Sequence, residues 1–198
     1  LREELNSALL LITHDLGVVA GNCERILVLN EGQLLEEGTT RDVFASPTSQ
    51  KMREFLAASP SLATKGPTYD VEMARDAILQ VDDLAVNFRD RRSRGRARLS
   101  AVHSMSLTLA KGETLAVVGE SGSGKTSLAR AVMGLIPADS GKVLFLGDTL
   151  PTRVDRRSRA VHRELQMIFQ DPLASLNPAM RVSDIVAEPL RTHGSGGD

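Results

Sequence analysis

One eight-residue segment, GESGSGKT at positions 119–126, restricts the possible folds more than any other part of this sequence. It satisfies the pattern G-x-x-x-x-G-K-[ST], follows the apolar run at 114–118, and precedes a helical pattern at 125–135. In a strand–loop–helix unit of this kind, glycines let successive backbone N–H groups turn inward around phosphate oxygens. The segment therefore predicts an α/β P-loop fold with a site for nucleotide phosphates.

The residue types in this loop each have a chemical role. Lys125 is expected to put its charge on the β- and γ-phosphates, and the Thr126 hydroxyl is expected to bind Mg²⁺. A Cβ at Gly122 or Gly124 would obstruct the cradle. The residues predicted to contact ATP are Gly119, Glu120, Ser121, Gly122, Ser123, Gly124, Lys125 and Thr126. Because many NTPases share this loop, it predicts a nucleotide but not a reaction.

Two segments with different strand patterns lie on either side of a stretch without apolar periodicity, residues 61–76, which is predicted to be a linker. Residues 1–60 contain a continuous apolar run, typical of a strand buried in a parallel sheet, and a hairpin pattern. Residues 77–198 begin with alternating apolar and polar positions, typical of antiparallel strands. The expected fold is α/β, with a mainly parallel core sheet and an antiparallel β subdomain.

The patterns also predict individual elements. Helices are predicted at 1–6, 15–20, 40–44, 49–58 and 125–135, and strands at 8–12, 25–29, 33–36, 78–81, 84–88, 104–109, 114–118 and 142–147.

Composition narrows the range of partners. Lys+Arg 24 and Asp+Glu 25 give a net charge of -1, so the overall charge gives no reason to expect nucleic acid. Six arginines at 89–98 are either a solvated insertion or a phosphate or RNA site, and no aromatic residues interleave with them for base stacking. The single Cys23 cannot form an internal disulfide, which favours a reducing compartment. No apolar run of about 18 residues occurs, so any membrane association is expected to be peripheral.

Sequences beyond the loop resemble a known family. QMIFQDP at 166–172, SLNP at 175–178 and AEPL at 187–190 resemble the Q-loop region of ABC transporter ATPases, in particular the oligopeptide and dipeptide (peptide/nickel) uptake family. The resemblance implies that Gln170 senses Mg²⁺ and the attacking water, and that the following segment faces a transmembrane subunit. It also implies that Phe88 stacks on adenine; the alternative for Phe88 is a core residue at a strand end.

The first segment resembles the opposite end of the same kind of domain. LITHDLGVV at 11–19 is similar to the switch-histidine segment, in which His14 would leave a buried strand and reach the γ-phosphate. Without that resemblance, a single histidine is more simply a structural residue. In the family the phosphate loop precedes this histidine, whereas here the histidine comes first. The resemblance therefore implies a tandem-fused ATPase, with the end of one domain in 1–60 and the start of another in 77–198, both incomplete. His14 and Lys125 would then serve different ATP sites.

The resemblance implies ATP binding and, in an intact parent, ATP hydrolysis that energises import of peptides or related solutes. The family's Walker B and signature motifs do not occur in this sequence, since 78–83 and 195–198 imitate them only superficially. Implied partners are transmembrane permease subunits, a solute-binding protein and a second ATPase domain in head-to-tail pairing, at the cytoplasmic face of the inner membrane. Two alternatives remain: a non-transport ABC ATPase acting on nucleic acid or the ribosome, and an inactive truncated fragment.

Overall fold

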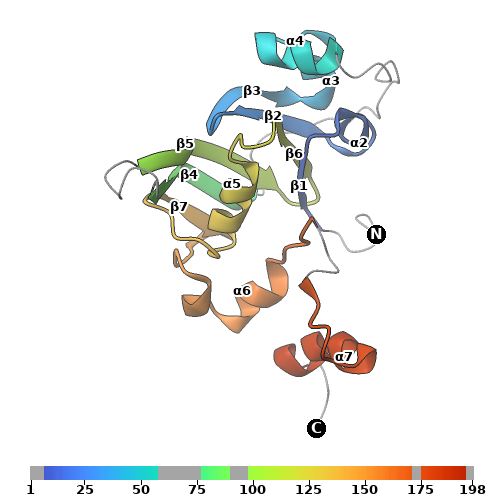
Figure 1. Cartoon of the computed structure of the whole chain (residues 1–198), viewed down its shortest axis with the longest axis vertical. Coiled ribbons are helices and arrows are strands. Elements are labelled where there is room, and N and C mark those ends of the chain that lie inside the picture. The colour runs from blue at the N-terminus through green and yellow to red at the C-terminus, as the bar shows by residue number, and fades with distance from the viewer. Residues whose placement is uncertain (1–6, 58–76, 90–97, 171–174, 195–198) are drawn as a thin grey trace. The chain divides into compact units, whose positions relative to one another are not determined.

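The computed structural model describes residues 7–57, 77–89, 98–170 and 175–194 (Figure 1). The chain forms two compact units, Leu1–Arg153 and Val154–Asp198, which are described separately. The helix predicted at 1–6, the linker predicted at 61–76 and most of the arginine-rich segment lie outside the described residues.

One four-stranded sheet combines strands from both sequence segments. Its order is β1-β6-β2-β3, and its strands are β1 (Leu9–Thr13), β2 (Arg25–Asn30), β3 (Gln33–Thr39) and β6 (Thr114–Gly119). β6 pairs in parallel with β1 on one side and β2 on the other, as Figure 1 shows, while β2 and β3 form an antiparallel hairpin. Every residue of β6 is buried, and this strand has a neighbour on each side. The predicted parallel core is thus confirmed, and its central strand comes from the second segment.

Three short helices of the first segment supply the core on one face of this sheet. They are α2 (Leu16–Asn22), α3 (Thr40–Ala45) and α4 (Gln50–Ala57). Their buried side chains, among them Val19, Val43 and Met52, form one cluster with Ala116 and Val118 of β6. The hydrophobic interior of the first segment is therefore completed by the strand that leads into the phosphate loop.

A second sheet has the order β5-β4-β7-β8 and is antiparallel throughout. Its strands are β4 (Ala77–Arg89), β5 (Arg98–Ala110), β7 (Ser140–Phe145) and β8 (Asp148–Thr149). This confirms the predicted antiparallel subdomain. The strands predicted at 78–81 and 84–88 form one strand, with a pairing irregularity between Val81 and Leu84, where Asp83 adopts φ 48°. An irregularity of this kind bends a strand without ending it.

Helix α5 (Lys125–Val132) follows the phosphate loop and is shorter than the predicted 125–135. It stops at Met133, because Gly134 adopts φ 72°, a left-handed conformation that ends helices. The second unit contains η1 (Val154–Arg156), α6 (Arg159–Glu164) and α7 (Val182–His193). Within the described residues, no helix combines the length and apolar content needed to cross a membrane.

Candidate nucleotide-binding site

The loop between β6 and α5 is packed so closely that two of its positions exclude a side chain. A Cβ at Gly119 would lie 2.0 Å from the carbonyl oxygen of Leu29, and a Cβ at Gly124 would lie 2.2 Å from that of Ala101. Gly124 also has φ 98°, which favours glycine. Gly122 differs, since it has φ 84° but no atom lies within 4 Å of the position that a Cβ would take. The expected obstruction at Gly124 therefore arises from the backbone of β5. At Gly122, glycine is favoured by the left-handed backbone conformation and not by a lack of space.

The start of α5 offers backbone donors to an anion. Gly124 is the N-cap residue and provides no side-chain hydrogen bond, so no side chain of the cap competes for the first N–H groups of the helix. These N–H groups and the positive end of the helix dipole favour a bound anion.

Lys125 brings a charge to the same place. Its Nζ donates to the carbonyl oxygens of Gly119 at 2.9 Å and Glu120 at 2.7 Å, and lies 3.3 Å from Ser123 Oγ. These partners are neutral oxygens, and burial lowers the pKa of Lys125 from its ordinary value. An incoming phosphate oxygen would provide the negative charge that these three contacts lack.

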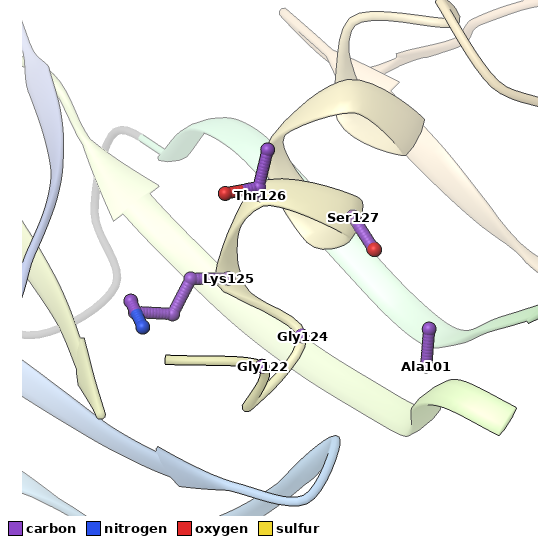
Figure 2. Close-up of a pocket in the computed structure, with 6 residues that line it drawn as sticks. All are labelled: Ala101, Gly122, Gly124, Lys125, Thr126 and Ser127. Carbon is purple, nitrogen blue, oxygen red and sulfur yellow. The ribbon is translucent and has the colours of Figure 1, made fainter. Parts of the chain in front are cut away.

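A pocket of about 130 Å³ lies at this helix start and is shown in Figure 2. Its lining residues are Ala101, Gly122, Gly124, Lys125, Thr126 and Ser127. Since a water molecule occupies about 30 Å³ in the liquid, the pocket has room for a phosphate-sized group beside Lys125 and Thr126. Lysine, hydroxyl and backbone N–H donors are the groups that bind phosphate and its Mg²⁺, so the residues present fit ATP with Mg²⁺.

A metal at this pocket would depend on the nucleotide. Among the residues that the structure describes, no group of three or more His, Cys, Asp or Glu side chains is arranged to hold a metal ion. The Thr126 hydroxyl is one oxygen ligand, and Mg²⁺ commonly takes the others from substrate phosphates and water.

The first segment supports this loop through contacts that sequence reasoning did not predict. The N–H of Gly32, in the turn between β2 and β3, donates to the carbonyl oxygen of Ser123 at 2.9 Å. The carbonyl oxygen of Gly32 in turn accepts from the N–H of His103 at 2.8 Å. The Asn30–Gly32 turn was recognisable as a hairpin signal, but only the strand order brings it to the phosphate loop.

His14 lies next to the sheet edge that leads into the phosphate loop, and its assignment to a separate ATP site stays a prediction. His14 directly follows β1, whose last residue Thr13 is in register with Val118, the residue before Gly119. The carboxyl ends of β1 and β6 therefore lie side by side at one edge of one sheet, and the His14 side chain is exposed there. β6 needs a neighbour on each side, and the first segment supplies both.

The two remaining predicted site residues lie elsewhere. Phe88 is 43% exposed, so it is not a core residue; it pairs with Leu99, two positions before the pocket residue Ala101. Gln170 is exposed and belongs to the other compact unit. Of the 166–178 motif region, residues 171–174 lie outside the described residues. The roles of Phe88 and Gln170 stay predictions.

Comparison with known proteins gives the family context. The family model "ABC transporter" matches residues 102–193, which include the whole phosphate loop. Over 219 aligned residues, the chain is 35% identical to "Glutathione import ATP-binding protein GsiA" of Escherichia coli (strain K12), an alignment that covers 98% of this chain and 35% of that protein.

Proteins of the same name in two other bacteria give similar values. The chain is 36% identical to the protein of Shigella flexneri serotype 5b (strain 8401), and 35% identical to that of Salmonella choleraesuis (strain SC-B67). The chain spans about a third of the length of these curated relatives, 35% and 36% respectively. The match at residues 102–193, together with the loop geometry, identifies this part of the chain as ABC transporter ATP-binding domain sequence.

Proposed function

We propose that this chain binds ATP with Mg²⁺ through Gly119–Thr126, as part of an ATPase that energises solute import. The single observation that carries the proposal is the position of Lys125. Its ammonium group is held by neutral oxygens, beside a pocket at a helix start without a side-chain cap. A phosphate group in this site would accept hydrogen bonds from the Lys125 ammonium group and from the N–H groups at the start of the helix.

Different residues of the loop would bind different parts of the ligand. Lys125 would exchange its carbonyl partners for β- and γ-phosphate oxygens, and Thr126 would contribute its hydroxyl to Mg²⁺. Bound Mg²⁺ would neutralise phosphate charge. The loop N–H groups would bind oxygens through a backbone that Gly119 and Gly124 allow to pack closely against β2 and β5.

Three further residues are proposed to act near the bound nucleotide. His14, at the carboxyl end of β1, would hydrogen-bond the γ-phosphate or orient water. Gln170 would sense Mg²⁺ and the attacking water, and Phe88, whose ring is exposed on β4, would stack on adenine.

In the whole protein, we propose ATP hydrolysis coupled to import of a peptide or related solute. The names of the similar proteins refer to glutathione import, which agrees with a small peptide-related solute. The proposed partners are transmembrane permease subunits, a solute-binding protein and a second ATPase domain paired head to tail, at the cytoplasmic face of the inner membrane. Residues 1–60 and 77–198 would belong to consecutive ATPase domains; one alignment that runs through both segments supports this order.

Titration of a fluorescent ATP analogue tests the proposed phosphate site. Lys125→Ala is expected to weaken binding by about 1–3 kcal/mol, because a charge-assisted contact is lost. Lys111→Ala, which removes an exposed charge in the turn between β5 and β6, serves as the control and should bind like the wild type. Equal affinity of wild type and Lys125→Ala would contradict the proposal.

A further inference from the structure

An acidic side chain lies inside the predicted phosphate loop, where its charge would oppose an anionic ligand. Glu120 follows Gly119 directly, and its carbonyl oxygen accepts a hydrogen bond from Lys125 Nζ. Its side chain is 53% exposed. Two like charges a few ångströms apart repel even at high dielectric, so a cation beside this carboxylate would lower the cost of placing phosphates in the loop.

That cation comes from the first segment of the chain. Lys51, on α4, places its Nζ 2.6 Å from Glu120 Oε1. The distance is that of a short charge-assisted hydrogen bond. The hydrogen bond with Glu120 raises the pKa of Lys51 above its ordinary value.

Local contacts hold the Lys51 ammonium in this position. It lies 3.5 Å from Glu54 Oε2, one turn along the helix, and 5.7 Å from the centre of the Phe55 ring. The side chain is 29% exposed, less than that of Glu120. These two local interactions reduce the entropy that a long side chain would lose in forming the pair with Glu120.

The helix that carries Lys51 is itself fixed. Met52, the next residue, is fully buried in the core cluster with Ala116 and Val118 of β6. At the start of α4, the Ser49 N–H and hydroxyl both donate to Glu36. Lys51 therefore extends from an anchored helix that packs on the same strand that leads into the loop.

We propose that Lys51 is a positioning residue of the phosphate site, which neutralises Glu120 and fixes the loop from the α4 side. The inference rests on the proposed nucleotide binding at Gly119–Thr126. Glu120 is then held from two directions, its carbonyl oxygen by Lys125 and its carboxylate by Lys51. When Lys125 turns to a phosphate, the contact with Lys51 remains and keeps the carboxylate away from the ligand.

A double-mutant cycle tests the pair in the full chain, with a fluorescent ATP analogue as the probe. Lys51→Met keeps the apolar stem against Phe55 and removes the charge, and is expected to weaken binding by about twofold to fivefold. Lys51→Arg should restore most of the affinity. In a Glu120→Gln background, which has no carboxylate to neutralise, Lys51→Met should change the affinity much less than in the wild type.

Two controls separate this pair from general effects. Lys142→Met removes an equally charged side chain from an exposed ion pair with Asp82 in the other sheet, and should leave the affinity unchanged. Amide hydrogen exchange of the nucleotide-free protein should become faster in the loop segment 119–124 in Lys51→Met but not in Lys142→Met. This second readout needs no ligand.

The outcomes distinguish this inference from the proposed function. If Lys125→Ala loses affinity while Lys51→Met keeps both the affinity and the loop exchange of the wild type, the phosphate site stands and the role of Lys51 is overturned. The proposed role of Lys51 is also overturned if Lys51→Met lowers the affinity equally in the wild type and in the Glu120→Gln background. The loss would then not depend on the Lys51–Glu120 ion pair. Unchanged binding in Lys125→Ala would instead contradict the proposed function, and loop exchange alone would then decide the role of Lys51.

Discussion

The guanidinium of Arg25 donates to the carboxylate of Glu113, with 2.8 Å between Nη1 and Oε1, and this ion pair joins the two sequence segments. The side chains are 8% and 6% exposed, respectively. Arg25 also donates to the carbonyl oxygen of Thr108 and pairs with Glu37. Burial opposes the charge of Arg25, but the charges and hydrogen bonds of Glu113 and Glu37 outweigh it and raise the pKa of the guanidinium.

Removal of Arg25 is expected to destabilise the fold strongly. Arg25→Met leaves Glu113 buried without this cation, and breaking a buried pair from one side typically costs about 3–5 kcal/mol. Chemical denaturation measures the change in the free energy of unfolding. Lys142→Met breaks an exposed pair with Asp82 and should cost no more than about 1 kcal/mol. If both variants lowered the free energy of unfolding by similar amounts, the buried pair would stabilise the fold no more than the exposed pair does.

The carboxylate of Glu36 is predicted to make stability depend on pH. It is buried on β3 and accepts from Thr48 N at 2.7 Å, Ser49 N at 3.0 Å and Ser49 Oγ at 2.7 Å, which connects β3 to the start of α4. Burial alone would raise the pKa of Glu36, but these hydrogen bonds outweigh it and lower the pKa below its ordinary value of 4.5.

The sign of this effect follows from the lowered pKa. The stabilisation by Glu36 is fully present above the pKa of the unfolded chain and is lost as the pH falls through the folded-state pKa. Glu36→Gln should therefore lower the free energy of unfolding by about 1–2 kcal/mol at pH 7. The difference from the wild type should shrink as the pH falls below 4.5. A difference that stays constant between pH 7 and pH 3 would contradict this role.

The loop glycines should respond differently to alanine. At Gly124 the added methyl group would meet the Ala101 carbonyl oxygen, so Gly124→Ala is expected to displace the loop from β5 and to weaken binding of an ATP analogue at least tenfold, about 1.4 kcal/mol. Gly122→Ala meets no atom and adds only the cost of a left-handed alanine, about 1–2 kcal/mol of stability. Binding by Gly124→Ala as strong as by Gly122→Ala would contradict the close packing at β5.

Local chemistry explains why much of the fold could be predicted. The apolar run that became β6, the glycine and lysine positions of the loop, and the hairpin turn at Asn30–Gly32 each depend on a few neighbouring residues. A helix cap such as Asp15, whose side chain accepts from Gly17 N at 2.9 Å, is similarly local. These signals also predicted the correct sheet types. A strand that is buried on both faces, as in a parallel sheet, has a continuous apolar run, whereas a half-exposed antiparallel strand alternates apolar and polar residues.

Pairing between distant strands could not be predicted in the same way. Strand periodicity gives the faces of a strand but not its neighbours, so nothing in the pattern of β1 indicated β6 as its partner. The Lys51–Glu120 and Arg25–Glu113 pairs depend on that order and were missed for the same reason. Assigning residues 1–60 and 77–198 to two ATPase domains stays a prediction, while within this chain the two segments share a sheet.

The shared sheet predicts that the two segments stay together after the chain between them is cut. β6 pairs with β1 and β2 and lies under the core cluster of α2, α3 and α4, so separation would expose apolar surface and unpaired strand edges. With a protease site inserted within 61–76, both fragments should elute as one species in size-exclusion chromatography and separate only in denaturant. Ala116→Glu, which buries a charge in the shared core, should make the cut fragments separate. Separation of the unmutated fragments in native buffer would contradict the shared sheet and would favour two independent folding units.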